Sequence, residues 1–89
     1  MTEIEIAGVQ EALDYFDEIV RKMLILFPIT RAEAVGRLNR FWAGQQFSEE
    51  LDVNLLRHED TNYWAKTIYY GANTQWWKGE EGLQPERYP

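Results

Sequence analysis

The clearest pattern of apolar and polar positions runs from Val9 to Phe27. Pro28 disfavours helical geometry at the residue before it, so a helix over this stretch is predicted to end at Phe27 or one residue earlier. The apolar positions are separated alternately by four and three residues, which places them on one stripe of a helix. They are Val9, Leu13, Phe16, Val20, Met23 and Phe27.

A second helix is predicted to begin after Thr30, because Thr30 and Glu33 have the spacing of a capping box. Gly44 stands where a left-handed residue would end it. Gly36, inside this helix, costs about 1 kcal/mol relative to alanine, and a close crossing with another helix would explain it. The predicted inner face consists of Ala34, Val35, Leu38, Phe41 and Trp42.

A third helix is predicted from Thr61 to Tyr70, stopped by Gly71, with Asp60 or Thr61 as its N-cap. One face carries Trp64, Ala65 and Ile68, and the neighbouring face carries Tyr63, Thr67 and Tyr70. Because more than half of its circumference is apolar or amphipathic, this helix is expected to be central. Trp64 is expected in the core, against the two preceding helices.

Two segments have more than one interpretation. At the start, Thr2 with Glu5 fits a capping box, whereas Ile4 and Ile6 alternate as in a short strand. Over residues 45–57, Ser48 followed by two glutamates resembles a helix start, and Phe47, Leu51 and Leu55 recur every four residues. A short helix is favoured there, although residues 52–56 would also serve as an extended segment.

These elements predict an all-α fold, a small bundle of three to four helices formed by one domain over residues 1–89. The 89 residues leave no room for a second domain. Glycines and prolines concentrate after Gly71, so residues 72–89 are predicted to form an irregular, aromatic tail that packs back on the helices.

The charge of the chain, −6 at neutral pH, is arranged in blocks. Residues 1–18 carry only acidic charges, residues 19–46 are mainly basic, and residues 47–60 are again mainly acidic. Blocks of opposite sign can pair within the fold, and the acidic total disfavours nucleic acid as a partner. With no cysteine, no basic leader followed by an apolar stretch, and no long apolar run, a cytoplasmic protein away from membranes is expected.

His58, the only histidine, lies beside Glu59 and Asp60 and is the first candidate for chemistry. The spacing of a zinc protease fails, because Asn62 stands where the second histidine belongs. Carboxylates before a helix are better explained as capping groups that interact with the helix dipole. No catalytic residue, metal ligand or cofactor is therefore predicted, and the chain is expected not to be an enzyme.

Aromatic rings are the most abundant candidate binding groups, and the tryptophans all follow residue 41. A domain this small does not need every ring in its core, and exposed tyrosine and tryptophan are enriched at protein interfaces. The predicted function is an acidic protein-interaction module: an inhibitor or immunity-type protein that masks a basic partner, or a homodimer. The predicted partner-binding residues are Trp42, Tyr70, Trp76 and Trp77.

Two alternatives remain. Arg31, Arg37 and Arg40 would lie on the helix after Thr30, so a nucleic-acid-binding helical domain is the first alternative, although pairing with the acidic blocks is favoured. A small enzyme or ligand-binding protein with an unrecognised carboxylate site is the second.

The stretch that begins HED at His58, continues through YWA and IYYG, and is followed by WW at Trp76 resembles a segment of small uncharacterised bacterial proteins. It covers about a quarter of the chain. The resemblance implies a bacterial, cytosolic origin, and it implies no activity.

Overall fold

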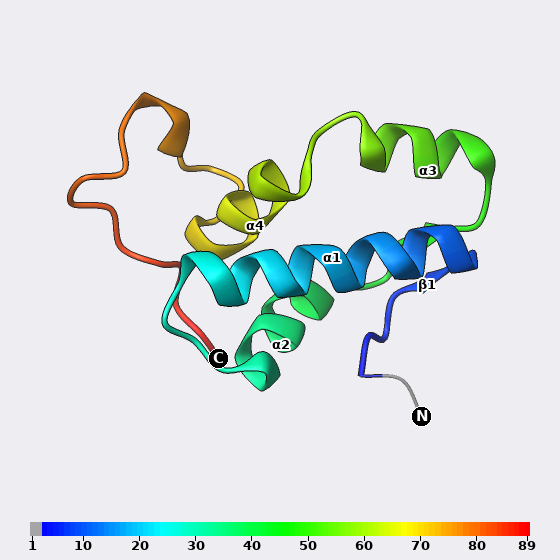
Figure 1. Cartoon of the computed structure of the whole chain (residues 1–89), viewed down its shortest axis with the longest axis horizontal. Helices are drawn as coiled ribbons and strands as arrows, with labels where there is room; N and C mark the ends of the chain where they lie inside the picture. Colours follow the sequence, from blue (N-terminus) through cyan, green and yellow to red (C-terminus); the bar gives the residue numbers. More distant parts are fainter. Residues whose placement is uncertain (1–2) are drawn as a thin grey trace.

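A computed structural model describes residues 3–89, which form four α-helices and a two-stranded parallel sheet (Figure 1). The elements are β1 (Ala7–Gly8), α1 (Gln10–Leu26), α2 (Arg31–Phe41), β2 (Gln46–Phe47), α3 (Glu50–Arg57), α4 (Thr61–Tyr70) and a 3-10 turn, η1 (Trp76–Lys78). The predicted all-α class and the fourth helix are confirmed, and the sheet was not predicted. The suggested capping box at the start includes Thr2, which lies outside the described residues.

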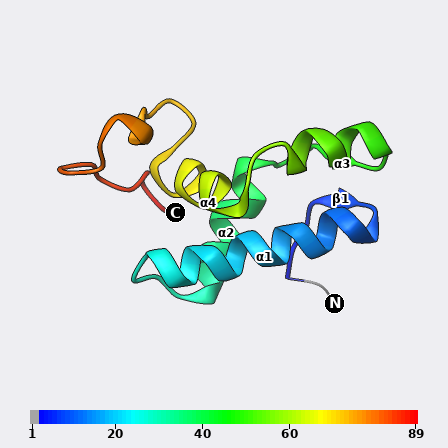
Figure 2. The same ribbon diagram turned by 45° about the horizontal axis from the view of Figure 1, so that its top comes forward.

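Helix α1 follows the predicted stripe closely. Val9 and Phe27 are its N-cap and C-cap, and Phe27 is extended, as expected for a residue before proline. Phe16, Val20 and Met23 of the stripe are fully buried. Because α1 contacts α2, α3 and α4, this face forms the centre of the hydrophobic core (Figure 2).

Helices α2 and α4 begin at the caps that the sequence indicates. Thr30 Oγ1 accepts a hydrogen bond from the amide of Glu33, and Asp60 Oδ1 accepts one from the amide of Tyr63. Gly71, just after α4, has a positive φ of 100°. These ends are set locally, so both helices occupy their predicted places.

Helix α3 confirms a helix in the ambiguous segment, and the extended alternative is wrong. Its N-cap is Glu49 rather than Ser48, in a capping box with Asp52. The inward residues are Val53 and Leu56, whereas Leu51 and Leu55, which recur every four residues in the sequence, face the solvent. Neighbouring β2 pairs with β1 in parallel, which brings the N-terminal segment beside the start of α3.

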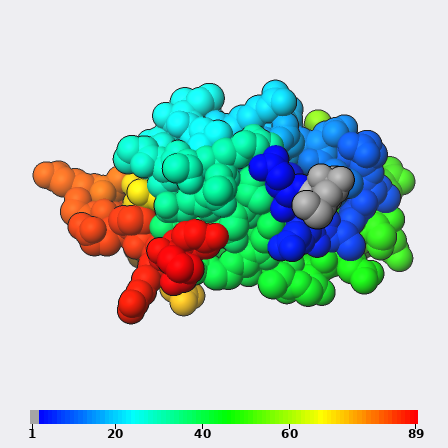
Figure 3. Space-filling view, turned by 90° about the horizontal axis from the view of Figure 1, so that it is seen from below, coloured from blue at the N-terminus to red at the C-terminus, as the bar shows by residue number. Residues whose placement is uncertain are grey.

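The segment after α4 packs back on the helices at its far end. The amide of Glu86 donates to the carbonyl of Tyr69, and Arg37 Nη1 donates to the carbonyl of Glu86. A Cβ on Gly36 would overlap the hydroxyl of Tyr88. The missing side chain therefore makes room for the tail, whereas a crossing helix was expected at this position. Figure 3 shows the C-terminal residues, in red, lying against the helices.

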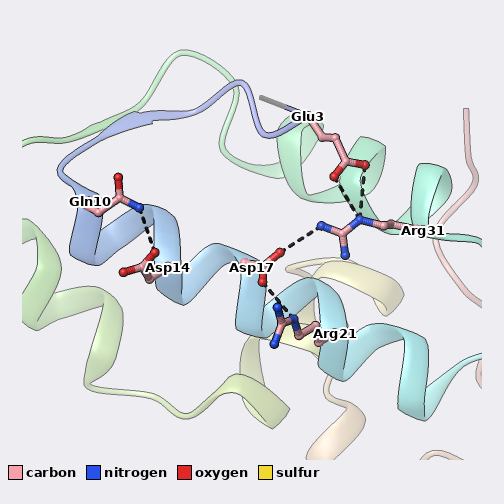
Figure 4. Close-up of polar contacts among 6 residues, drawn as sticks. All are labelled: Glu3, Gln10, Asp14, Asp17, Arg21 and Arg31. Atoms are coloured by element: carbon pink, nitrogen blue, oxygen red, sulfur yellow. Dashed lines mark hydrogen bonds and ion pairs between the residues drawn. The ribbon is translucent and has the colours of Figure 1, made fainter. Parts of the chain in front are cut away.

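The charge blocks pair as the sequence suggests. Arg31 bridges Glu3 and Asp17 of the first acidic block, and Asp17 also pairs with Arg21 (Figure 4). Pairs this exposed contribute about 0 to 1 kcal/mol each. Their effect here is to neutralise Arg21 and Arg31, two cations of the middle block.

Within residues 3–89, no helix combines the length and the apolar character that crossing a membrane requires.

Candidate functional site

The four aromatic residues predicted to bind a partner differ in exposure. Trp77 is 58% exposed, whereas Trp76 and Tyr70 are half-buried. Trp42 is only 5% exposed, because its ring packs on Phe16 and Phe47 at centroid distances of 5.3 and 5.6 Å. Trp42 is therefore a core residue. Its predicted place on the inner face of the second helix is confirmed, and its assignment to the partner-binding set is corrected.

A series of ring contacts connects this core residue to the tail. Trp64 lies 5.1 Å from Trp42 and 5.1 Å from Tyr63, and Trp76 lies 5.8 Å from both Tyr63 and Trp77. Trp64 was expected in the core but is half-buried, and its indole N–H donates to the carbonyl of Leu56. Of these contacts, the one between Tyr63 and Trp76 joins α4 to the tail, and Trp77 is the member of the series left exposed.

A polar network fixes the same part of the tail. Lys66 Nζ lies 2.5 Å from Glu80 Oε2, and the hydroxyl of Tyr70 donates to Glu80 Oε1. The hydrogen bond from Lys66 lowers the pKa of the Glu80 carboxyl below its ordinary value, the bond from Tyr70 lowers it further, and burial opposes both. Burial, followed by the bond to Glu80, raises the pKa of Tyr70.

We expect Lys66→Met to raise the pKa of Glu80. A carboxyl whose folded-state pKa is depressed stabilises the fold above its unfolded pKa, and this contribution is lost as the pH falls through the folded pKa. The wild-type protein should therefore lose more stability on acidification than the variant does. Carbon NMR of the Glu80 carboxyl across pH measures the shift, and Lys78→Met, an exposed change in the same tail, is the control. An unchanged Glu80 pKa in Lys66→Met would contradict the pairing.

A second apolar surface lies on α3, at the opposite end of the long axis from the tail (Figure 1). Leu51 and Leu55 are one helical turn apart, and they are 65% and 64% exposed. The four-residue spacing of the two leucines indicated a helix but did not show that they face the solvent. A signal was present, since the short helix carries apolar residues on both sides.

Beside Leu55 the surface is hollowed into an open groove of about 250 Å³ between α3, β2 and the end of α2. Buried Trp42, Phe47 and Leu56 form its floor, and Leu55 and Trp64 line it nearer the solvent. We call this groove, together with Leu51, the α3 surface. Gln45, Gln46 and Asp52 also line the groove, so its lining is mixed. Aromatic and aliphatic side chains beside exposed leucines nevertheless suit the binding of an apolar side chain.

Acidic side chains border the α3 surface. Asp52 lines the groove, and Glu49 and Glu50 are exposed at the start of α3. Among residues 3–89, none of these three carboxylates takes part in an ion pair, whereas the nearby Arg57 pairs with Glu11 at 2.7 Å. The negative charge of these three side chains is therefore not neutralised by a cation among residues 3–89.

His58 is the exposed C-cap of α3, and Asp60 caps α4 two residues later. The interpretation of Asp60 as a helix-capping group is thus confirmed. In the described part of the chain, no three histidine, aspartate or glutamate side chains lie close enough together to hold a metal ion.

The arginines of α2 do not form an open basic face. Arg37 is 4% exposed and pairs with Glu33, Arg31 pairs as described above, and Arg40 lies 3.7 Å from Glu86. Arg37 and Arg40 also lie over the ring of Tyr88.

Neither a protein-family model, nor a curated protein, nor a solved structure matches this chain.

Proposed function

We propose that the protein is a non-enzymatic interaction module that binds another protein through the α3 surface. One observation carries the proposal: Leu51 and Leu55 lie on the same side of α3, each about two-thirds exposed, beside a groove floored by aromatic rings. Exposing two neighbouring leucines to water costs on the order of 1.5 to 3 kcal/mol per side chain relative to burial. Because each leucine is already about one-third buried, a partner that covers both gains about two-thirds of this amount per side chain.

The acidic border of the surface supports a basic partner, as an inhibitor or immunity-type protein would have. Opposite charges accelerate encounter and exclude wrong partners. Trp77 supplies a second exposed ring, and it belongs to η1 in the segment after α4. Figure 1 shows this segment at the other end of the molecule from α3, so one small partner contacting both is disfavoured. Nucleic acid receives no support from α2, whose arginines are engaged in ion pairs.

We expect the double variant Leu51→Ser/Leu55→Ser to weaken the partner's affinity by about tenfold or more while the fold is kept. Covering an apolar side chain of this size is worth on the order of 1.5 to 3 kcal/mol, and about 1.4 kcal/mol corresponds to a tenfold change in affinity. The partner would be isolated from an extract of the source cells, identified, purified and titrated against both proteins. Ile25→Ser is the matched control, because Ile25 is 76% exposed on α1 outside this surface.

Equal affinity of the wild-type protein and the double variant would show that the partner binds elsewhere, and the α3 surface would then not be the interface. Circular dichroism of each variant establishes that the fold is retained. Since both leucines are largely exposed, we expect changes within about 0.5 kcal/mol in unfolding free energy.

A further inference from the structure

The shape of the α3 surface indicates what kind of segment it accepts. Leu51 and Leu55 are four residues apart, so they form one ridge along α3. Such ridges fit between the side chains of a second helix, whose own apolar residues recur every three to four positions. The groove beside Leu55 provides the depression into which one of those side chains can insert. Helix α3, with eight residues, spans roughly 12 Å, enough for about two turns of a partner helix.

The charge of the same surface indicates the polar side of that segment. Glu49, Glu50 and Asp52 are unpaired with any cation in residues 3–89, and Arg57, at the other end of α3, is held by Glu11. The α3 dipole contributes about half a positive charge at its N-terminus, far less than three carboxylates. The surface therefore attracts cations, and a partner needs lysine or arginine beside its apolar stripe.

From this combination we infer that the α3 surface binds a basic amphipathic helix of another protein, with an apolar residue in the groove and its cations against Glu49, Glu50 and Asp52. The inference rests on the proposed function and adds the chemistry of the partner. A second copy of this chain is a poorer occupant. It carries the same three carboxylates and a charge of −6, and the nearest arginine that it could offer, Arg57, is already paired.

A synthetic peptide of about 15 residues, long enough to form a marginal helix, is the probe. It is built from leucine, lysine and alanine, with leucine every three to four positions. A second peptide has glutamate in place of each lysine, and a third has alanine in place of each leucine. Indole N–H resonances in nitrogen-15 NMR report the site, because Trp42 and Trp64 line the groove and Trp77 lies in the tail.

We expect the lysine peptide to shift the Trp42 and Trp64 resonances in a saturable way, to leave Trp77 unchanged, and to bind more weakly as salt is added. The other two peptides should bind at least about tenfold more weakly, since each lacks one of the two complementary features. Equal binding of the lysine and glutamate peptides, or a shift at Trp77 alone, would overturn the inference. Concentration-dependent shifts at Trp42 without peptide would identify a second copy as the occupant, and they would overturn it as well.

Neutralisation of the acidic border tests the charge directly. In Glu49→Gln/Glu50→Gln/Asp52→Asn the side-chain shapes and the capping acceptors are kept, so α3 should fold. Affinity for the lysine peptide should fall about tenfold. The control with the same net charge, Asp14→Asn/Glu18→Gln/Glu81→Gln, carries exposed changes outside the groove and should keep most of the affinity. If both triple variants lost the same affinity for the lysine peptide, only the total charge of the protein would matter. The inference that Glu49, Glu50 and Asp52 contact the peptide would then be wrong.

The outcomes separate this inference from the proposed function. An isolated partner that depends on Leu51 and Leu55 but binds through an acidic or a non-helical segment leaves the function standing and refutes the basic helix. An isolated partner insensitive to both leucines, together with no binding of the lysine peptide, refutes both.

Discussion

Replacement of Phe16 by alanine is expected to lower the free energy of unfolding by about 3 to 5 kcal/mol. The Phe16 side chain is fully buried, and its ring contacts Trp42 at 5.3 Å and Phe47 at 5.2 Å. One ring thus joins α1 to the end of α2 and to β2, and its removal leaves a cavity among rings that cannot close it. Domains of this kind are stable by only about 5 to 15 kcal/mol, so much of that stability would be lost.

Chemical denaturation followed by circular dichroism measures the change. Ile25→Ala, a truncation on the same helix at a 76% exposed position, should change the stability by less than about 0.5 kcal/mol. A loss below about 1 kcal/mol in Phe16→Ala would mean that the three elements do not meet around this ring.

The helices with strong local signals were predictable from the sequence. The apolar stripe of α1, the Thr30 cap of α2 and the Asp60 cap of α4 are each set by residues within a few positions of one another. In these segments helix propensity, capping and apolar periodicity all favour the same structure, and the packing of the whole fold is consistent with these local preferences.

Features that depend on distant residues were not predictable. The pairing of Ala7 with Gln46 joins two-residue strands far apart in the sequence, and so short a strand has no periodicity to detect. Gly36 makes room for Tyr88, again a distant residue. No local pattern indicates which segment will fill such a space.

The candidate site was only partly predictable for a related reason. Helix α3 has apolar residues on two sides, and the sequence does not decide which side faces the core. Burial of Val53 and Leu56 leaves Leu51 and Leu55 outside, which creates the exposed surface. Trp42 was predicted both on the inner face of its helix and among the partner-binding residues, because tryptophan is common at interfaces. Its contact with Phe16 shows that the first prediction holds. Exposure of a ring is decided by packing and not by residue type.

Arg37 connects α2 to the far end of the tail. Its side chain is 4% exposed, donates through Nε to Glu33 at 2.8 Å, and donates through Nη1 to the carbonyl of Glu86 at 2.7 Å. The guanidinium also lies over the rings of Tyr69 and Tyr88. A planar group with five donors suits this arrangement, and lysine cannot reproduce it.

We therefore expect Arg37→Met, which keeps most of the apolar stem, to cost about 2 to 4 kcal/mol, since hydrogen bonds from a charged donor are worth roughly 1.5 to 3 kcal/mol each. The stability should be lost mainly in the tail. The amide of Glu86, which donates to the carbonyl of Tyr69 at 2.8 Å, should therefore exchange hydrogen faster, and the amides in the middle of α1 should be affected less. Arg37→Lys should recover only part of the lost stability. Arg40→Met is the control: it removes an exposed arginine that lies 3.7 Å from Glu86, and it should lower the free energy of unfolding by less than about 1 kcal/mol. Native-state hydrogen exchange and denaturation measure both effects. If the Glu86 amide exchanges equally fast in Arg37→Met and the wild-type protein, Arg37 does not hold the tail, and the ring of Tyr88 against Gly36 becomes the anchor to test.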